Sequence, residues 1–101
     1  MASTMPKEIR GSFPLTGEPD HATHPGVLLG DELEEREMTQ RELAALMGRP
    51  PQLVSEIVRG KRAVTPETAL QLEHALKISA RFWMNLQTQY DLVLARQKRS
   101  A

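Results

Sequence analysis

Polar and basic side chains that could contact a nucleic acid lie close together in one stretch of this chain of 101 residues. Gln52 and Ser55 are one helical turn apart. A glutamine amide can pair with N6 and N7 of adenine, whereas a serine hydroxyl is less selective. Arg59, Lys61 and Arg62 follow, and such cations pair with phosphates without reading a base sequence. We therefore predict a surface for duplex DNA here, against the alternative that these are ordinary solvated side chains.

The charges of the chain are separated along its length rather than unbalanced. Its 13 Lys and Arg residues match its 13 Asp and Glu residues, so the chain is not a nonspecific polycation. Acidic residues dominate positions 31–42 and basic residues dominate positions 49–62, with further cations near the C-terminus. This separation predicts a basic patch for a phosphate backbone, and an acidic helix face that is either solvated or docks a basic partner.

What the sequence lacks excludes several classes of function. Without cysteine, it can form no disulfide, thiolate nucleophile or cysteine-ligated zinc site. No apolar run approaches the roughly 20 residues of a membrane span, and no secretory signal is evident, so a cytoplasmic protein is expected. No nucleophile–base pair or glycine-rich phosphate loop occurs, so we expect neither an enzyme nor a cofactor. His21 and His24 near Asp20 are not expected to bind a metal in so proline-rich a segment.

The chain divides into an N-terminal arm and one helical domain. Residues 1–24 contain Pro6, Pro14 and Pro19 and only sparse, aperiodic apolar residues, so we expect little regular structure there. This arm is either dispensable or becomes ordered on a partner. Residues 25–101 carry helical signals and are expected to form a helix-turn-helix domain for DNA binding and dimerisation.

Helix start and stop signals divide this domain into five expected helices. Pro25, Pro51 and Pro66 each precede a helical pattern, and proline suits the first position of a helix. Thr39 and Glu42 have the spacing of a capping box. The expected helices cover residues 25–36, 40–47, 51–59, 66–77 and 80–96. No strand pattern competes with them, so the predicted fold class is all-α.

The second and third expected helices have the spacing of a helix-turn-helix. Ala44 is small enough to let two helices cross, and Gly48 suits a left-handed turn. Val54 and Ile57, three residues apart, would anchor the third helix to the core. Arg49 departs from the pattern, because a hydrophobe usually follows the turn glycine; its stem can cover the core while its head group reaches toward DNA. A plain helical hairpin is the alternative.

The start of the second helix adds a phosphate site to this surface. Backbone N–H groups and the helix dipole coincide at Gln40, which suits an anion. Glu56 would repel phosphate, so we expect it to pair with Arg59 or Lys61 or to accept from a cytosine amine. The predicted DNA-contacting residues are Thr39, Gln40, Arg49, Gln52, Ser55, Arg59, Lys61 and Arg62.

The last expected helix carries a long apolar stripe. One helix-turn-helix covers only half of a symmetric DNA site, so a homodimer is expected. The stripe exceeds what one small core needs, and part of it is therefore assigned to a two-fold interface. The alternative is that the stripe packs wholly within the monomer. The predicted interface residues are Phe82, Trp83, Leu86, Tyr90, Val93 and Leu94.

Five segments between residue 24 and about residue 95 resemble the HigA/VapI family of addiction-module antitoxins. They are His24-Pro25-Gly26, Thr39-Gln40 with Leu43-Ala44, the stretch 56–62, the stretch 65–70, and the stretch 82–87 followed by Tyr90-Asp91-Leu92. The resemblance implies a lambda-repressor-like, XRE-type domain in a dimeric repressor of its own operon. It also implies neutralisation of a HigB-like toxin, typically a ribosome-dependent mRNA endonuclease. A stand-alone regulator without a toxin, and an interaction module that has lost DNA binding, are the alternatives.

Overall fold

The computed structural model describes residues 22–100, which form five α-helices and no strand. The helices are α2 (Pro25–Glu35), α3 (Gln40–Met47), α4 (Pro51–Val58), α5 (Pro66–Leu76) and α6 (Ala80–Ser100). The predicted all-α, five-helix fold is thus confirmed. The first four helices end within one residue of the expected positions, whereas α6 continues to Ser100 instead of ending near Arg96. The first 21 residues of the predicted arm lie outside the part of the chain that the structure describes.

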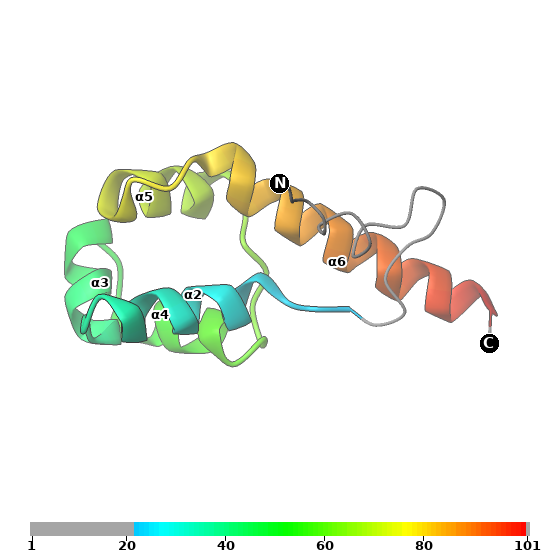
Figure 1. Cartoon of the computed structure of the whole chain (residues 1–101), viewed down its shortest axis with the longest axis horizontal. Coiled ribbons are helices and arrows are strands. Elements are labelled where there is room, and N and C mark those ends of the chain that lie inside the picture. Colours follow the sequence, from blue (N-terminus) through cyan, green and yellow to red (C-terminus); the bar gives the residue numbers. More distant parts are fainter. Residues whose placement is uncertain (1–21, 101) are drawn as a thin grey trace, which may run out of the picture.

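The helices enclose one core between two sides (Figure 1). α2 and α4 pack together on one side, α5 and the beginning of α6 form the other, and α3 contacts both α4 and α5 at one end. The C-terminal half of α6, drawn in orange to red, extends beyond the other helices (Figure 1). The fully buried side chains of the core come from all five helices and include Leu29, Leu43, Ile57, Leu72 and Trp83.

Gly26 allows α2 to lie directly against the backbone of α4. A Cβ atom at this position would stand 1.8 Å from the carbonyl oxygen of Ile57, so no side chain fits. Two backbones can approach this closely only where one of them carries glycine, which has no Cβ atom. The His24-Pro25-Gly26 segment therefore begins α2 and also sets its distance from the candidate DNA-reading helix.

The helix ends follow the local rules expected from the sequence. The Thr39 hydroxyl accepts from the Glu42 N–H at 3.0 Å, and the Glu42 carboxylate accepts from the Thr39 N–H at 2.9 Å, which completes the capping box. Gly48 ends α3 in the left-handed conformation with φ of 70°. Thr65 caps α5 by accepting from the Thr68 N–H at 3.2 Å. These caps fix where α3 and α5 begin, and Gly48 fixes the turn into α4.

The inner face of α6 corrects the predicted dimer interface. Trp83 is fully buried among core residues, and Val93 is also buried, so neither side chain is available to a second copy. Trp83 faces inward because α6 closes the core against α5, whereas Val93 lies outside the core cluster and borders a groove between α6 and the start of α2. Of the predicted stripe, Leu86 and Tyr90 are partly buried. Phe82 and Leu94 remain exposed, at 39% and 40%, and Leu92, outside the predicted stripe, is exposed as well.

Candidate nucleic-acid interface

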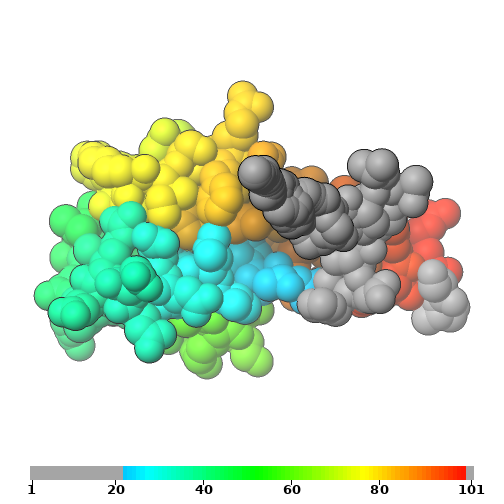
Figure 2. All heavy atoms as spheres, in the orientation of Figure 1, coloured from blue at the N-terminus to red at the C-terminus, as the bar shows by residue number. Residues whose placement is uncertain are grey.

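The α4 helix separates apolar residues from polar ones. Leu53, Val54 and Ile57 are buried, whereas Gln52 is exposed and Ser55 is partly exposed. The predicted anchors Val54 and Ile57 therefore hold α4 to the core, while the predicted readers lie on its accessible side. In the space-filling view, the green segment at the end of α4 and the following loop protrudes at the lower edge of the molecule (Figure 2).

The crossing of α3 and α4 has the expected geometry. Ala44 is buried where the helices pack together, and the left-handed Gly48 turns the chain between them. The Arg49 N–H donates to the Ala44 carbonyl at 3.0 Å, which closes the turn. A larger residue than alanine at position 44 would push the two helices apart, so α3 braces α4 through a small buried side chain.

Glu56 connects the exposed residues of α4 to the following loop. Its carboxylate accepts from Nε2 of Gln52 at 3.0 Å and from Nε of Arg62 at 2.7 Å. The hydrogen bond from Arg62, followed by that from Gln52, holds the pKa of the Glu56 carboxyl below its ordinary value. The prediction that Glu56 pairs with Arg59 or Lys61 was wrong, because its basic partner is Arg62. The loop after α4 folds back so that Arg62 reaches the helix.

Two other predicted contact residues are held by neighbours. Nε of Arg59 donates to the Ser55 hydroxyl at 3.3 Å, one turn earlier on the same helix. Nη1 of Arg49 donates to Oε1 of Gln71 on α5 at 2.9 Å, and Arg49 is partly buried. The head group expected to reach toward DNA thus fastens the turn to α5 in this structure.

Residues suited to phosphates lie at the ends of the two helices. Gln40 is exposed at the first position of α3, and the capping box uses the backbone N–H of Glu42 rather than that of Gln40. Arg59, Lys61 and Arg62 are exposed after the end of α4. Exposed cations and a helix N-terminus are the groups that usually hold a DNA backbone.

His24 has a structural role that the sequence did not reveal. Its Nδ1 accepts from the Gly26 N–H at 2.8 Å, which caps α2, and its ring meets that of Tyr90 edge-on at 4.9 Å between centroids. Burial lowers the pKa of His24, outweighing the opposite effects of a hydrogen bond to the Arg62 backbone and of the Asp91 carboxylate. Within residues 22–100, no group of three potential metal ligands occurs, and the predicted non-ligands Asp20 and His21 lie outside that range.

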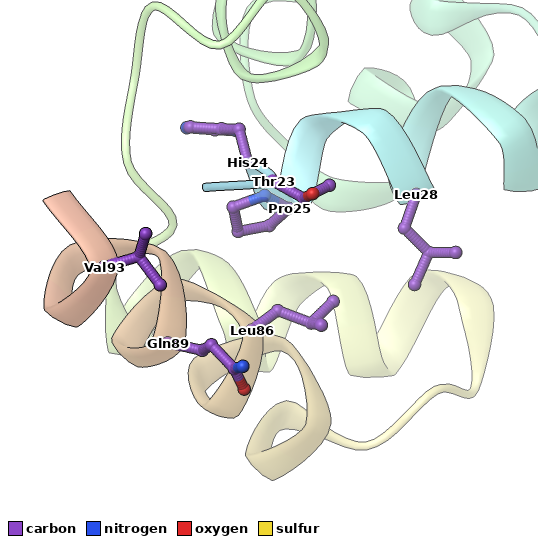
Figure 3. Close-up of a pocket in the computed structure, with 7 residues that line it drawn as sticks. All are labelled: Thr23, His24, Pro25, Leu28, Leu86, Gln89 and Val93. Carbon is purple, nitrogen blue, oxygen red and sulfur yellow. The ribbon is translucent and has the colours of Figure 1, made fainter. Parts of the chain in front are cut away.

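A mainly apolar groove lies between the start of α2 and α6 (Figure 3). It has a volume of about 240 Å³. In the close-up, Leu28 of α2 and Leu86 of α6 extend toward each other across it (Figure 3). The remaining lining residues are Thr23, His24, Pro25, Gln89 and Val93. Leu86 and Val93 of the predicted dimer stripe thus border this groove.

No helix in the described part of the chain is long and apolar enough to span a membrane.

The α4 helix packs across α3, has polar residues on its accessible side and is followed by exposed cations, and this arrangement defines a helix-turn-helix domain of the DNA-binding class. A helix-turn-helix family model matches residues 29–83. Virulence-associated protein I of Dichelobacter nodosus is 37% identical over 81 residues, which cover 79% of this chain and 75% of that protein.

Solved structures of antitoxins are similar to this chain in both fold and sequence. Pseudomonas aeruginosa antitoxin HigA, determined with the higBA promoter, has a TM-score of 0.76 and 34% identity, covering 79% of this chain and 88% of that one. An addiction module antidote protein of the HigA family from Coxiella burnetii has a TM-score of 0.75, also with 34% identity and with the same coverage of both chains. The chain belongs to the HigA/VapI family of helix-turn-helix antitoxins. Membership of this DNA-binding, non-enzymatic family confirms two predictions from the sequence. The chain is a helix-turn-helix DNA-binding protein, and it is not an enzyme.

Proposed function

We propose that this protein is the antitoxin of a type II toxin–antitoxin module, which binds its operator as a dimer and represses its own operon in the cytoplasm. It also neutralises a HigB-like toxin that cleaves mRNA. The observation that carries the DNA-binding part is the exposure of Gln52 and Ser55 on a helix whose opposite side is buried. Family membership supports the antitoxin part.

In this proposal, α4 enters the major groove and the cations beside it hold the phosphates. Gln52 and Ser55 contact base edges, and each good contact contributes about 1–3 kcal/mol of discrimination. The N-terminus of α3 with Gln40, and the cations Arg59 and Lys61, supply affinity that depends on salt but not on sequence. Thr39 acts at the same phosphate by fixing the start of α3.

The homodimer is proposed to form along α6, through apolar residues that the monomer leaves exposed. Phe82 and Leu94 are each about two-fifths exposed there, and the groove beside Leu86 offers a concave apolar surface to a second copy. Burial of such surface stabilises association, and two-fold symmetry would present two α4 helices to two half-sites.

Binding to the DNA upstream of the gene tests the operator part. We expect the dissociation constant to rise steeply with salt and the affinity for unrelated DNA to be at least about 10³-fold lower. A variant with Gln52→Ala and Ser55→Ala should lose the sequence preference but keep salt-dependent binding. Binding without salt dependence would contradict the proposal.

Co-purification with the product of the neighbouring gene tests the antitoxin part. A stable complex with a small basic protein that cleaves mRNA when released is the expected result. A chain that represses its promoter but has no such neighbour would instead be a stand-alone regulator, the second candidate.

A further inference from the structure

The carboxylate of Glu56 joins the reading residue of α4 to the loop beyond it. Gln52 lies one helical turn before Glu56, and Arg62 lies six residues after it. The two carboxylate oxygens are divided between them: Oε2 accepts from Gln52 and Oε1 accepts from Arg62. Only 22% of the Glu56 side chain is exposed, whereas half of the Arg62 side chain is exposed. Glu56 therefore lies beneath two groups that remain accessible to DNA.

A carboxylate can only accept hydrogen bonds, and this fixes the amide of Gln52 in one orientation. The NH₂ group of Gln52 must face Glu56, because the amide oxygen would meet another acceptor there. The atoms left for an outside partner are the amide oxygen and the second amide hydrogen. Together they form one acceptor beside one donor.

This pattern matches adenine and opposes guanine. Adenine presents an N6 donor beside an N7 acceptor in the major groove, whereas guanine presents two acceptors, O6 and N7. A glutamine that could rotate its amide freely would adapt better to either base. We propose that Glu56 is a positioning residue that fixes Gln52 for adenine and against guanine, and that it also orients Arg62 for a phosphate.

The inference rests on the proposed operator binding and adds the residue that sets its base preference. It also explains how an acidic residue is tolerated beside DNA. The Arg62 guanidinium balances the Glu56 charge, and its remaining nitrogens, Nη1 and Nη2, are left for a phosphate oxygen.

Binding of single-base operator variants tests this role. The position at which Gln52→Ala loses its preference identifies the base that Gln52 reads. At that position, the wild-type protein should prefer adenine over guanine by roughly tenfold or more. Glu56→Gln should reduce this ratio to less than about threefold, because an amide at position 56 offers a donor as well as an acceptor and permits both orientations of Gln52.

Affinity for unrelated DNA separates positioning from a loss of folding. Glu56→Gln should leave this affinity unchanged or increase it by a few-fold, since one negative charge is removed near phosphates. Glu73→Gln removes the same charge from an exposed position on α5 and should leave the adenine preference unchanged. Thermal melting of each variant checks that the fold is intact.

The outcomes distinguish this inference from the proposed function. If Glu56→Gln keeps the full adenine preference of a wild-type protein that binds its operator, Glu56 does not position Gln52, and the operator function stands. If Gln52→Ala changes the preference at no base, Gln52 is not a reader and the inference fails with it. If the wild-type protein shows no salt-dependent operator binding, both the inference and the proposed function are overturned.

Discussion

The α4 and α6 helices are both amphipathic, yet their sequences predicted their surroundings with different success. In α4, Val54 and Ile57 are buried and Gln52 is exposed, as the spacing of apolar residues requires. In α6, the predicted interface stripe is divided among the core, a groove and solvent. Trp83 lies in the core, Leu86 borders the groove, and the other members differ widely in exposure.

The lengths of the two helices explain this difference. α4 has 8 residues, begins at a proline, and packs against both α2 and α3. α6 has 21 residues and is therefore about 30 Å long, so its C-terminal half extends beyond the helices that cover its beginning (Figure 1). Burial along α6 thus depends on where its neighbours end, which the sequence of α6 does not encode.

Replacing Trp83 with alanine should give the largest effect, because it removes the biggest side chain of the core. We expect a loss of about 3–5 kcal/mol in the free energy of unfolding, measured by urea denaturation. A domain of this size has only about 5–15 kcal/mol in total. Phe82→Ala, at the exposed neighbouring position of α6, is the matched control and should cost about 1 kcal/mol or less. Equal losses of unfolding free energy in the two variants would contradict the burial of Trp83 and the exposure of Phe82 on α6.

Placing charges at the exposed apolar positions of α6 should separate the dimer without unfolding it. Phe82→Glu combined with Leu94→Glu should sediment as a monomer that still unfolds cooperatively, with a melting temperature lowered only by the loss of association. Operator affinity should fall by roughly 10²-fold or more, because the second half-site is no longer linked to the first. Leu70→Glu on α5, at a position 61% exposed, is the control and should remain dimeric. A double variant that is still a dimer would show that the interface lies elsewhere.

Local chemistry made most of the fold, and the buried and exposed sides of α4, predictable from the sequence. The capping box at Thr39, the left-handed Gly48 and the small Ala44 each act through neighbours a few residues away, and each has the expected conformation or burial. The pairing of Glu56 with Arg62 was missed because it depends on how a loop folds back, six residues along the chain. The position of His24 against Tyr90 was missed because it joins distant segments.

The loop after α4 should act on all DNA sequences alike, in contrast to the helix itself. Lys61→Ala with Arg62→Ala should lower the slope of log affinity against log salt by about two units per bound subunit, and so by about four for the proposed dimer, because each subunit loses two phosphate contacts. Binding measured on the operator and on unrelated DNA should weaken by the same factor. Lys61→Ala alone should lower the slope by about one unit per bound subunit. An unchanged slope would contradict the assignment of both cations to phosphates.

A smaller effect is expected at the start of α3, where only a cap is removed. Thr39→Ala should lower the free energy of unfolding by about 1 kcal/mol, because the Glu42 N–H loses its acceptor. This corresponds to a fall of about 4–8 °C in melting temperature for a domain of this size. Thr39→Ser keeps the hydroxyl and should behave like the wild-type protein. Equal melting temperatures for the alanine and serine variants would show that the capping box adds no stability.

The smallest effect is expected at the contact between the start of α2 and α6, which His24 makes dependent on pH. Burial lowers the pKa of His24 from 6.5, so the unfolded chain binds a proton more readily than the folded one. The stability that the neutral His24 contributes is therefore fully present above pH 6.5. It is lost as the pH falls from 6.5 through the lower pKa that His24 has in the folded protein. Hydrogen bonds from Arg62 and Gln52 lower the pKa of the Glu56 carboxyl from 4.5, away from the interval of pH 5 to pH 7.

Denaturant unfolding between pH 5 and pH 7 measures this dependence. A protonated His24 can no longer accept from the Gly26 N–H, so the cap of α2 weakens as the pH falls. His24→Asn keeps an acceptor at the cap but does not titrate, and it should flatten the pH dependence in this range. An equally steep dependence in the asparagine variant would assign the titration to another group. A flattened one would show that the His24 imidazole, which caps α2 and contacts Tyr90 of α6, causes this pH dependence.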